Sequence, residues 1–142
     1  MRVFFDASII IAALLSPSGG SSLLFEYVKQ ERIVGLTSQT VIDEILEEEK
    51  YKKLNKSRNE IVQFVAQSGL IIREAIGIEE ISSLQGQVDL DDAHLIAGAV
   101  QTKSAYLVTL DKKHLLREDI RQKFLPLRIL SPKELLQKLV NK

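Results

Sequence analysis

Two acidic residues stand at the ends of apolar segments that lie far apart in the sequence. Asp6 directly follows residues 3–5. Thr109 and Asp111 follow residues 105–108. Both segments are short, apolar and rich in residues that favour strands. Because ligands bind outside the carboxyl ends of the strands in open α/β sheets, we expect both carboxylates to emerge at the same edge of a buried sheet.

Two further acids lie on predicted helices, close to the faces that should be buried. Glu44 stands between two pairs of apolar residues, so a helix through this segment holds it near the buried side. Asp92 precedes an apolar helix face and therefore lies at the edge of the core. A carboxylate in such a place requires a partner or a function. Glu44 and Asp92 thus join Asp6 and Asp111 as candidate site residues.

The acidic run 89–92 contains more acids than one site requires. Asp89 and Asp92 are three residues apart and share a face of the helix start, whereas Asp91 projects elsewhere. An aspartate at a helix start also serves as a cap, and this is the favoured interpretation of Asp89. An offset of one residue in the helix would make Asp91, rather than Asp92, the acid of the site.

Four converging carboxylates would not persist without neutralisation. Two unit charges about 4 Å apart repel by about 4 kcal/mol at an effective dielectric of about 20. Either some of the acids are protonated or a cation lies among them. Ligands that are all oxygen select hard ions, so we expect Mg²⁺ or Mn²⁺ rather than zinc. Such ions bind phosphate oxygens and activate water, and the predicted chemistry is phosphodiester hydrolysis.

Strands and helices alternate along the whole chain, which positions these acids on one sheet. The pattern predicts an α/β fold, a three-layer α/β/α sandwich with a central parallel sheet of about five strands, in a single domain spanning residues 1–142. A polar connection is expected at 50–56. The predicted strands are 3–5, 33–36, 70–72, 105–108 and 127–130, and the predicted helices are 7–15, 23–30, 38–49, 59–67, 78–84, 89–101, 112–116 and a last one from 131.

The composition sets limits on the class of protein. The 142 residues fit one domain, and the absence of cysteine excludes disulfides and thiolate metal sites. The formal net charge is zero, so nucleic-acid contact must come from local basic patches. The apolar run 9–15 is too short to span a bilayer, and Asp6 interrupts the apolar stretch before it, so we expect a cytoplasmic protein without a membrane segment.

Four segments together resemble PIN domains, and within them the bacterial and archaeal group that includes VapC-like toxins. Residues 3–8 look like the opening strand with its first acid, and 37–45 look like the segment with the glutamate. Residues 89–99 are similar to the helix of the third acid, and 106–111 to the closing Thr-x-Asp segment. Each segment alone is a weak signal, whereas all four in this order are fairly specific.

The resemblance implies a Mg²⁺- or Mn²⁺-dependent endoribonuclease. In that family the acids at Asp6, Glu44, Asp92 and Asp111 are both catalytic residues and metal ligands. The supporting residues would be Ser8, Thr109, Asp89 and Asp91. The resemblance also implies RNA as the substrate, a homodimer, and a small antitoxin protein as partner. Ser8 stands where the family often has Asn or Thr, which would weaken a polar contact there.

Other motifs are weaker. Lys112, Lys113 and Arg117 adjoin Asp111 and are favoured for contact with RNA phosphates, although surface solubility explains them nearly as well. Ser8, His94 and His114 do not form a recognisable nucleophilic triad, because there is no Gly-x-Ser-x-Gly segment and neither histidine has an obvious partner. His94 is interpreted as an ordinary surface histidine.

Two rival functions remain. An aspartyl phosphatase or phosphotransferase would use Asp6 as its nucleophile, but Ser8 occupies the place of the second acid in the expected Asp-x-Asp. A catalytically silent PIN-like module that binds RNA or protein would be favoured by a missing acid, and none of the four is missing. The sequence leaves open the RNA target, the number of ions and the oligomeric state.

Overall fold

The computed structural model describes residues 1–140, apart from the side chain of Glu48. Five strands form one sheet in which every neighbouring pair is parallel, in the order β3-β2-β1-β4-β5. This confirms the predicted parallel α/β sandwich. The strands are β1 (Arg2–Phe5), β2 (Val34–Ser38), β3 (Ile71–Arg73), β4 (Tyr106–Val108) and β5 (Arg128–Leu130).

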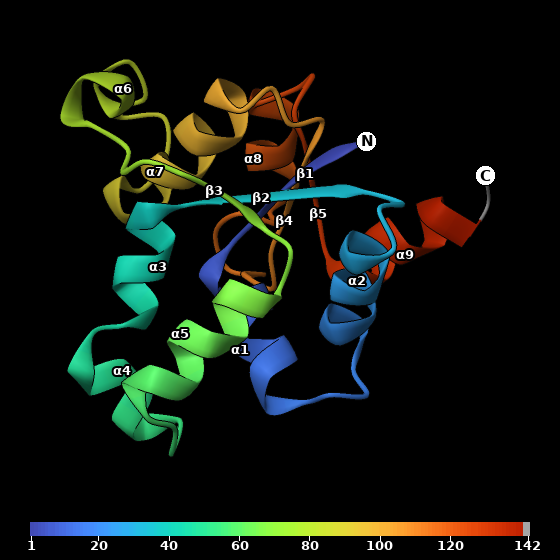
Figure 1. Cartoon of the computed structure of the whole chain (residues 1–142). Coiled ribbons are helices and arrows are strands. Elements are labelled where there is room, and N and C mark those ends of the chain that lie inside the picture. The colour runs from blue at the N-terminus through green and yellow to red at the C-terminus, as the bar shows by residue number, and fades with distance from the viewer. Residues whose placement is uncertain (141–142) are drawn as a thin grey trace.

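Helices cover both faces of this sheet. In Figure 1, α7 and α8 lie on one side of the sheet, and α1, α2 and α5 lie on the other. The helices are α1 (Ala7–Leu15), α2 (Gly20–Lys29), α3 (Gln39–Ile45), α4 (Glu48–Lys53), α5 (Arg58–Gln67), α6 (Ile78–Ser82), α7 (Leu90–Gln101), α8 (Glu118–Lys123) and α9 (Pro132–Val140). Because both faces are covered, the strands are apolar on both sides rather than alternating.

Strand β1 lies at the centre of the core. Val3, Phe4 and Phe5 are fully buried. β1 pairs with β2 on one side and with β4 on the other. The chain order therefore reverses direction at β1, and this is where ligands bind in open α/β sheets. The segments that follow β1, β2 and β4 consequently meet at one edge.

Helix α7 lies unusually close to β1 because one of its residues has no side chain. A Cβ atom built on Gly98 would lie 2.6 Å from the Phe4 ring. Real Cβ atoms do not approach so closely, so only glycine permits this distance between helix and strand. The close approach fixes how the start of α7, with its acidic run, lies relative to the end of β1.

Three predicted segments differ from the observed ones. The helix predicted over 23–30 begins earlier, since α2 begins at Gly20. The helix predicted over 38–49 ends at Ile45, because Glu47 is extended, and the polar connection predicted at 50–56 is helical as far as Lys53. The N-cap of α3 is Ser38, whose hydroxyl accepts a hydrogen bond from the Val41 amide.

The segment after β4 also differs from the prediction. Residues 112–116 form turns rather than a helix. The Asp111 carboxylate accepts a hydrogen bond from the His114 amide, and the Asp111 carbonyl accepts one from the Leu116 amide. These bonds close a turn around the acid. The helix α8 follows instead, and it was not predicted because Ile120 is its only buried residue and gives no helical periodicity.

Among the described residues, no single helix has the length and apolar character needed to cross a membrane. Helices α1 and α2 meet that test only when taken together, and they are bent by 100° where they join.

Candidate active site

Asp6 lies at the end of β1, at the centre of the sheet edge. Its side chain is 8% exposed, and although Asp6 is the N-cap residue of α1, its carboxylate does not cap that helix. Oδ2 instead accepts hydrogen bonds from the Thr109 hydroxyl at 2.6 Å and from the Ser8 hydroxyl at 3.1 Å. The acid is therefore held by residues of two chain segments rather than by its own helix.

The two supporting hydroxyls connect the ends of β1 and β4. Ser8 donates to Asp6 and accepts from the Leu110 amide at 3.1 Å. Thr109 donates to Asp6 and accepts from the Asp111 amide at 3.1 Å. Asp6 and Thr109 are 103 residues apart in sequence, so the network joins distant segments. It confirms the expectation that the polar residues after these two strands meet at one edge.

The acidity of Asp6 reflects its surroundings. Burial raises the pKa of this carboxyl, because a charge is less stable away from water. The hydrogen bonds from Thr109 and Ser8 lower it. The negative charge of Glu44 raises it further, which places Glu44 within electrostatic reach of Asp6.

A second group of side chains forms around Asp111. One ligand atom each from Asp92, Asp111 and His114 lies within 4.8 Å of the others. Burial, followed by the charge of Asp111, raises the pKa of Asp92 to about 6, and the charge of Asp6 contributes. His114 Nδ1 lies 3.3 Å from Asp111 Oδ2. Asp92 is thus the acid of its run that faces the other acids.

Glu44 has an unexpected neighbour. Its Oε1 atom lies 2.6 Å from His94 Nε2, on α7. The histidine is 6% exposed, so the prediction of an ordinary surface histidine was wrong. The contact has the distance of an ion pair, but Oε1 lies away from the direction of the ring N–H. His94 thereby joins α7 to α3 beside the acids.

The other acids of the run 89–92 lie differently. Asp89 is the N-cap of α7, and its carboxylate accepts from the Asp91 amide at 3.2 Å, which is the capping role expected of it. Asp91 is exposed. The geometry therefore favours Asp92 over Asp91 as the acid of the site.

The predicted RNA-contacting residues Lys112, Lys113 and Arg117 are exposed and differ in their surroundings. Arg117 forms a paired contact with Asp119 through two hydrogen bonds, of 3.1 and 2.8 Å, so its charge is partly compensated. Lys113 is exposed. Lys112 lines a groove beside Asp111. Lys112 and Arg117 thus line two different pockets near the acids, and Arg117 shares its pocket with Asp89 and His114.

Sequence patterns missed both histidines. His114 follows Asp111 by three residues, a spacing that brings two side chains together in a turn as well as in a helix. That spacing was the only available signal. His94 gave none, since its contact with Glu44 joins residues 50 positions apart, 94 − 44.

The donor set suits a hard divalent cation. Asp92 and Asp111 offer carboxylate oxygens and His114 offers a nitrogen within 4.8 Å of one another. Asp6 and Glu44 are outside that group, but Asp6 is within electrostatic reach of both Asp92 and Glu44. Two of these acids have raised pKa values, partly because of neighbouring negative charges. Bound positive charge would reverse that effect. The arrangement can hold a cation.

Comparison with known proteins agrees with this geometry. The fold is similar to that of VapBC2 from Rickettsia felis, solved bound to a DNA fragment from their promoter, with 13% identity and a TM-score of 0.64, covering 92% of this chain and 98% of that one. It is also similar to PAE2754 from Pyrobaculum aerophilum, with 15% identity and a TM-score of 0.63, covering 100% and 97%. At these identities the likeness concerns the fold alone.

None of the curated proteins compared with the chain matches it significantly. A family model of the PIN domain matches residues 2–113. That range holds most of the chain and all four candidate acids. The chain therefore belongs to the PIN-domain family.

Proposed function

We propose that this chain is a metal-dependent endoribonuclease whose catalytic and metal-binding residues are Asp6, Glu44, Asp92 and Asp111. The observation that carries the proposal is the cluster at the sheet edge, where one ligand atom each from Asp92, Asp111 and His114 lies within 4.8 Å of the others. The raised pKa of Asp92, caused first by burial and then by the charge of Asp111, supports it. Perturbed acids in a cluster at the ligand-binding edge of a parallel sheet are typical of a catalytic site.

The contacts indicate a separate role for the carboxylates and for the two hydroxyls. Mg²⁺ or Mn²⁺ held by these carboxylates would supply the positive charge that stabilises a phosphodiester undergoing hydrolysis and would lower the pKa of a water molecule. Thr109 and Ser8 fix the Asp6 carboxylate in one orientation through their hydroxyls. Thr109 also holds the Asp111 backbone, so both acids keep their places without rearrangement.

A protein partner and a dimer belong to the same proposal. The chain is similar in fold to VapBC2, which was solved bound to promoter DNA. From this likeness and from the resemblance to VapC-like toxins, we propose a small antitoxin that covers the acidic site, and a homodimer of the chain. Size-exclusion chromatography with light scattering, on the chain alone and co-expressed with the product of the adjacent gene, tests both.

The test of the activity uses paired variants. The purified chain is incubated with a pool of single-stranded RNA in Mg²⁺, in Mn²⁺ and in EDTA. Asp92→Asn is paired with Asp91→Asn, and Glu44→Gln with Asp43→Asn, since Asp43 is an exposed neighbour on the same helix. We expect metal-dependent cleavage that falls on the order of 100-fold in Asp92→Asn and Glu44→Gln. The two neighbouring variants should retain the wild-type rate.

Each alternative outcome has a distinct meaning. Loss of cleavage in Asp91→Asn with activity kept in Asp92→Asn would make Asp91 the ligand. Cleavage that survives EDTA would contradict a metal-dependent site. Absence of cleavage in every condition, together with RNA binding, would favour the binding module. A beryllofluoride adduct at Asp6 would favour the aspartyl phosphotransferase.

A further inference from the structure

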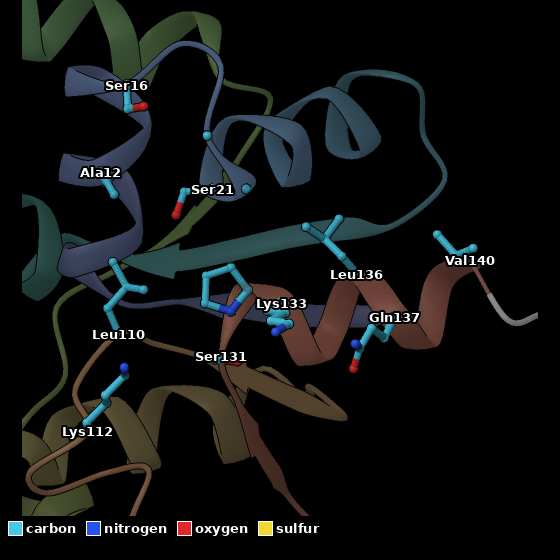
Figure 2. A pocket seen from close by; sticks show the side chains of 13 residues that line it. Ala12, Ser16, Ser21, Leu110, Lys112, Ser131, Lys133, Leu136, Gln137 and Val140 are labelled. Carbon is cyan, nitrogen blue, oxygen red and sulfur yellow. The ribbon is translucent and has the colours of Figure 1, made fainter.

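A groove in the described part of the chain lies beside the acidic site. Figure 2 shows it between α1, the start of α2, the loop after β4, and α9. Its volume is about 810 Å³, within the range of sites that bind small ligands. Leu110 and Lys112 form part of its wall, and they are the two residues that flank Asp111. The groove is therefore continuous with the loop that carries a candidate catalytic acid.

The start of α2 gives this groove an anion-binding end. The N-cap of this 10-residue helix is Gly19, which provides no side-chain cap. Within residues 1–140, the backbone amides of Gly20, Ser21 and Ser22 have no acceptor. Free amides at a helix N-terminus, together with the helix dipole, attract anions such as phosphate.

Ser21 provides a second and independent observation. The residue is 94% buried, yet its hydroxyl has no hydrogen-bond partner among the residues that the structure describes. Figure 2 shows this hydroxyl turned into the space bounded by Ala12, Leu110 and Leu136. A hydroxyl that has no partner within the described chain and is aimed into a groove is free to donate a hydrogen bond to a ligand bound there.

The charges on the walls match a phosphate. Lys112 and Lys133 both line the groove, and neither forms an ion pair in the described part of the chain. The remaining lining is mostly apolar and includes Leu136 and Val140 of α9. A ligand that fits must accept hydrogen bonds, carry negative charge and present an apolar surface. A nucleotide has all three properties, since its base is apolar on its faces.

We propose that this groove binds one nucleotide of the RNA substrate, adjacent to the scissile bond. Its phosphate accepts hydrogen bonds from the Ser21 hydroxyl and the free amides of α2, and Lys112 and Lys133 neutralise it. Its base lies against Leu136 and Val140. The inference rests on the proposed ribonuclease function, because it assigns the flanking nucleotide of that same substrate strand.

The first experiment follows the backbone amides by NMR without metal. ¹⁵N-labelled chain in EDTA is titrated with inorganic phosphate and, separately, with uridine 5′-monophosphate. We expect the amide signals of Gly20, Ser21 and Ser22 to shift with both probes, and more tightly with the nucleotide. Ser21→Ala should weaken the nucleotide several-fold. Amide signals that stay unmoved, or a Ser21→Ala variant that binds as well as wild type, would overturn the proposal.

The second experiment measures binding of a 12-nucleotide single-stranded RNA in EDTA at several salt concentrations. Lys112→Ala/Lys133→Ala should lower the affinity about tenfold, and each lost phosphate contact should reduce the slope of log K against log salt by about 0.7. Lys53→Ala, on α4, is the matched control and should bind as wild type does. Equal loss in the control would mean a general charge effect and would overturn the groove site.

These measurements separate the two proposals. Groove variants that bind RNA normally in a chain that cleaves RNA with metal would overturn the groove alone. If the groove binds the nucleotide but the chain shows no metal-dependent cleavage, the nucleotide site would stand and the proposed ribonuclease function would be overturned. Signals of groove residues that shift with protein concentration alone would show that a second copy occupies the groove, which also overturns this proposal.

Discussion

Thr109 connects the two acids that follow β1 and β4. It is fully buried, and its single hydroxyl donates to Asp6 while accepting from the Asp111 amide. The bond to Asp6 is buried and the bond from the Asp111 amide is partly buried. The energetic role of this residue is therefore larger than that of an ordinary surface hydroxyl.

Thr109→Val keeps the shape of the side chain and removes the hydroxyl. We expect the free energy of unfolding to fall by about 1–3 kcal/mol, because the Asp6 carboxylate and the Asp111 amide each lose a buried partner. Urea denaturation measures this change, and a Mn²⁺ titration should show weaker binding. Thr109→Ser keeps the hydroxyl and should behave nearly as wild type. Equal stability of the valine and serine variants would contradict this role.

The raised pKa of Asp92 makes the free energy of unfolding depend on pH in the absence of metal. Its pKa is about 6 in the folded chain, against 3.8 for the ordinary carboxyl. Between these values the folded state holds more protons than the unfolded state, so the free energy of unfolding falls as pH rises from about 4 to 6.

Asp92→Asn removes this titration. In EDTA above pH 6 the variant should be more stable than wild type, and the difference should disappear below pH 4. Thermal melts across this range measure it, with Asp91→Asn as the control. A wild-type chain whose stability rises between pH 4 and 6 relative to the variant would contradict the raised pKa.

The packing of the helices on the sheet determines whether the acidic residues can meet. Helix α7 carries Asp92 and His94, and its distance from β1 is set at Gly98, against the Phe4 ring. The fully buried Phe4 also packs inside the core, so it has little freedom to move away.

Gly98→Ala should destabilise the chain by about 1–3 kcal/mol, the usual effect of adding a methyl group to a filled core. It should also weaken metal binding, because α7 would move away from β1 and take Asp92 with it. Gly20→Ala is the control, since its Cβ would meet its nearest neighbour at an ordinary 3.5 Å. Denaturation and Mn²⁺ titration of both variants test the prediction. A stable Gly98→Ala variant would show that the sheet and helix can separate without cost.

The four proposed ligands come from four separate parts of the whole molecule: the end of β1, α3, the start of α7, and the loop after β4. A cation bound to all of them would join these segments across the sheet edge. Binding to the folded state alone stabilises that state, by about 2.7 kcal/mol when the ligand concentration is 100 times its Kd.

We therefore expect Mn²⁺ to raise the melting temperature of the chain and EDTA to reverse the effect. Asp6→Asn should lose most of this shift, whereas Asp43→Asn, on the exposed face of α3, should keep it. Thermal melts with increasing Mn²⁺ measure the effect. A shift that persists unchanged in Asp6→Asn would place the cation elsewhere on the molecule.

The sequence by itself determined the elements whose signals are local. An apolar run, an N-cap such as Ser38 and a break such as Gly69, with a φ of 84°, act within a few residues, so the strands and most helices were predicted. The convergence of Asp6, Thr109 and Asp111 followed as well, because parallel strands place their carboxyl ends at one edge. The local signals gave a wrong prediction at 112–116. There the carboxylate and the carbonyl of Asp111 accept backbone hydrogen bonds that close turns in place of a helix.

Only the tertiary structure decided the order β3-β2-β1-β4-β5, the contact of His94 with Glu44, and the groove that leaves Ser21 without a partner. Each of these joins segments tens of residues apart in the sequence. Such contacts depend on how closely the helices pack on the sheet. One example is the close approach of Gly98, on α7, to the Phe4 ring, on β1. The sequence pattern of one segment does not determine the distance between a helix and the sheet, because that distance depends on the side chains of both segments.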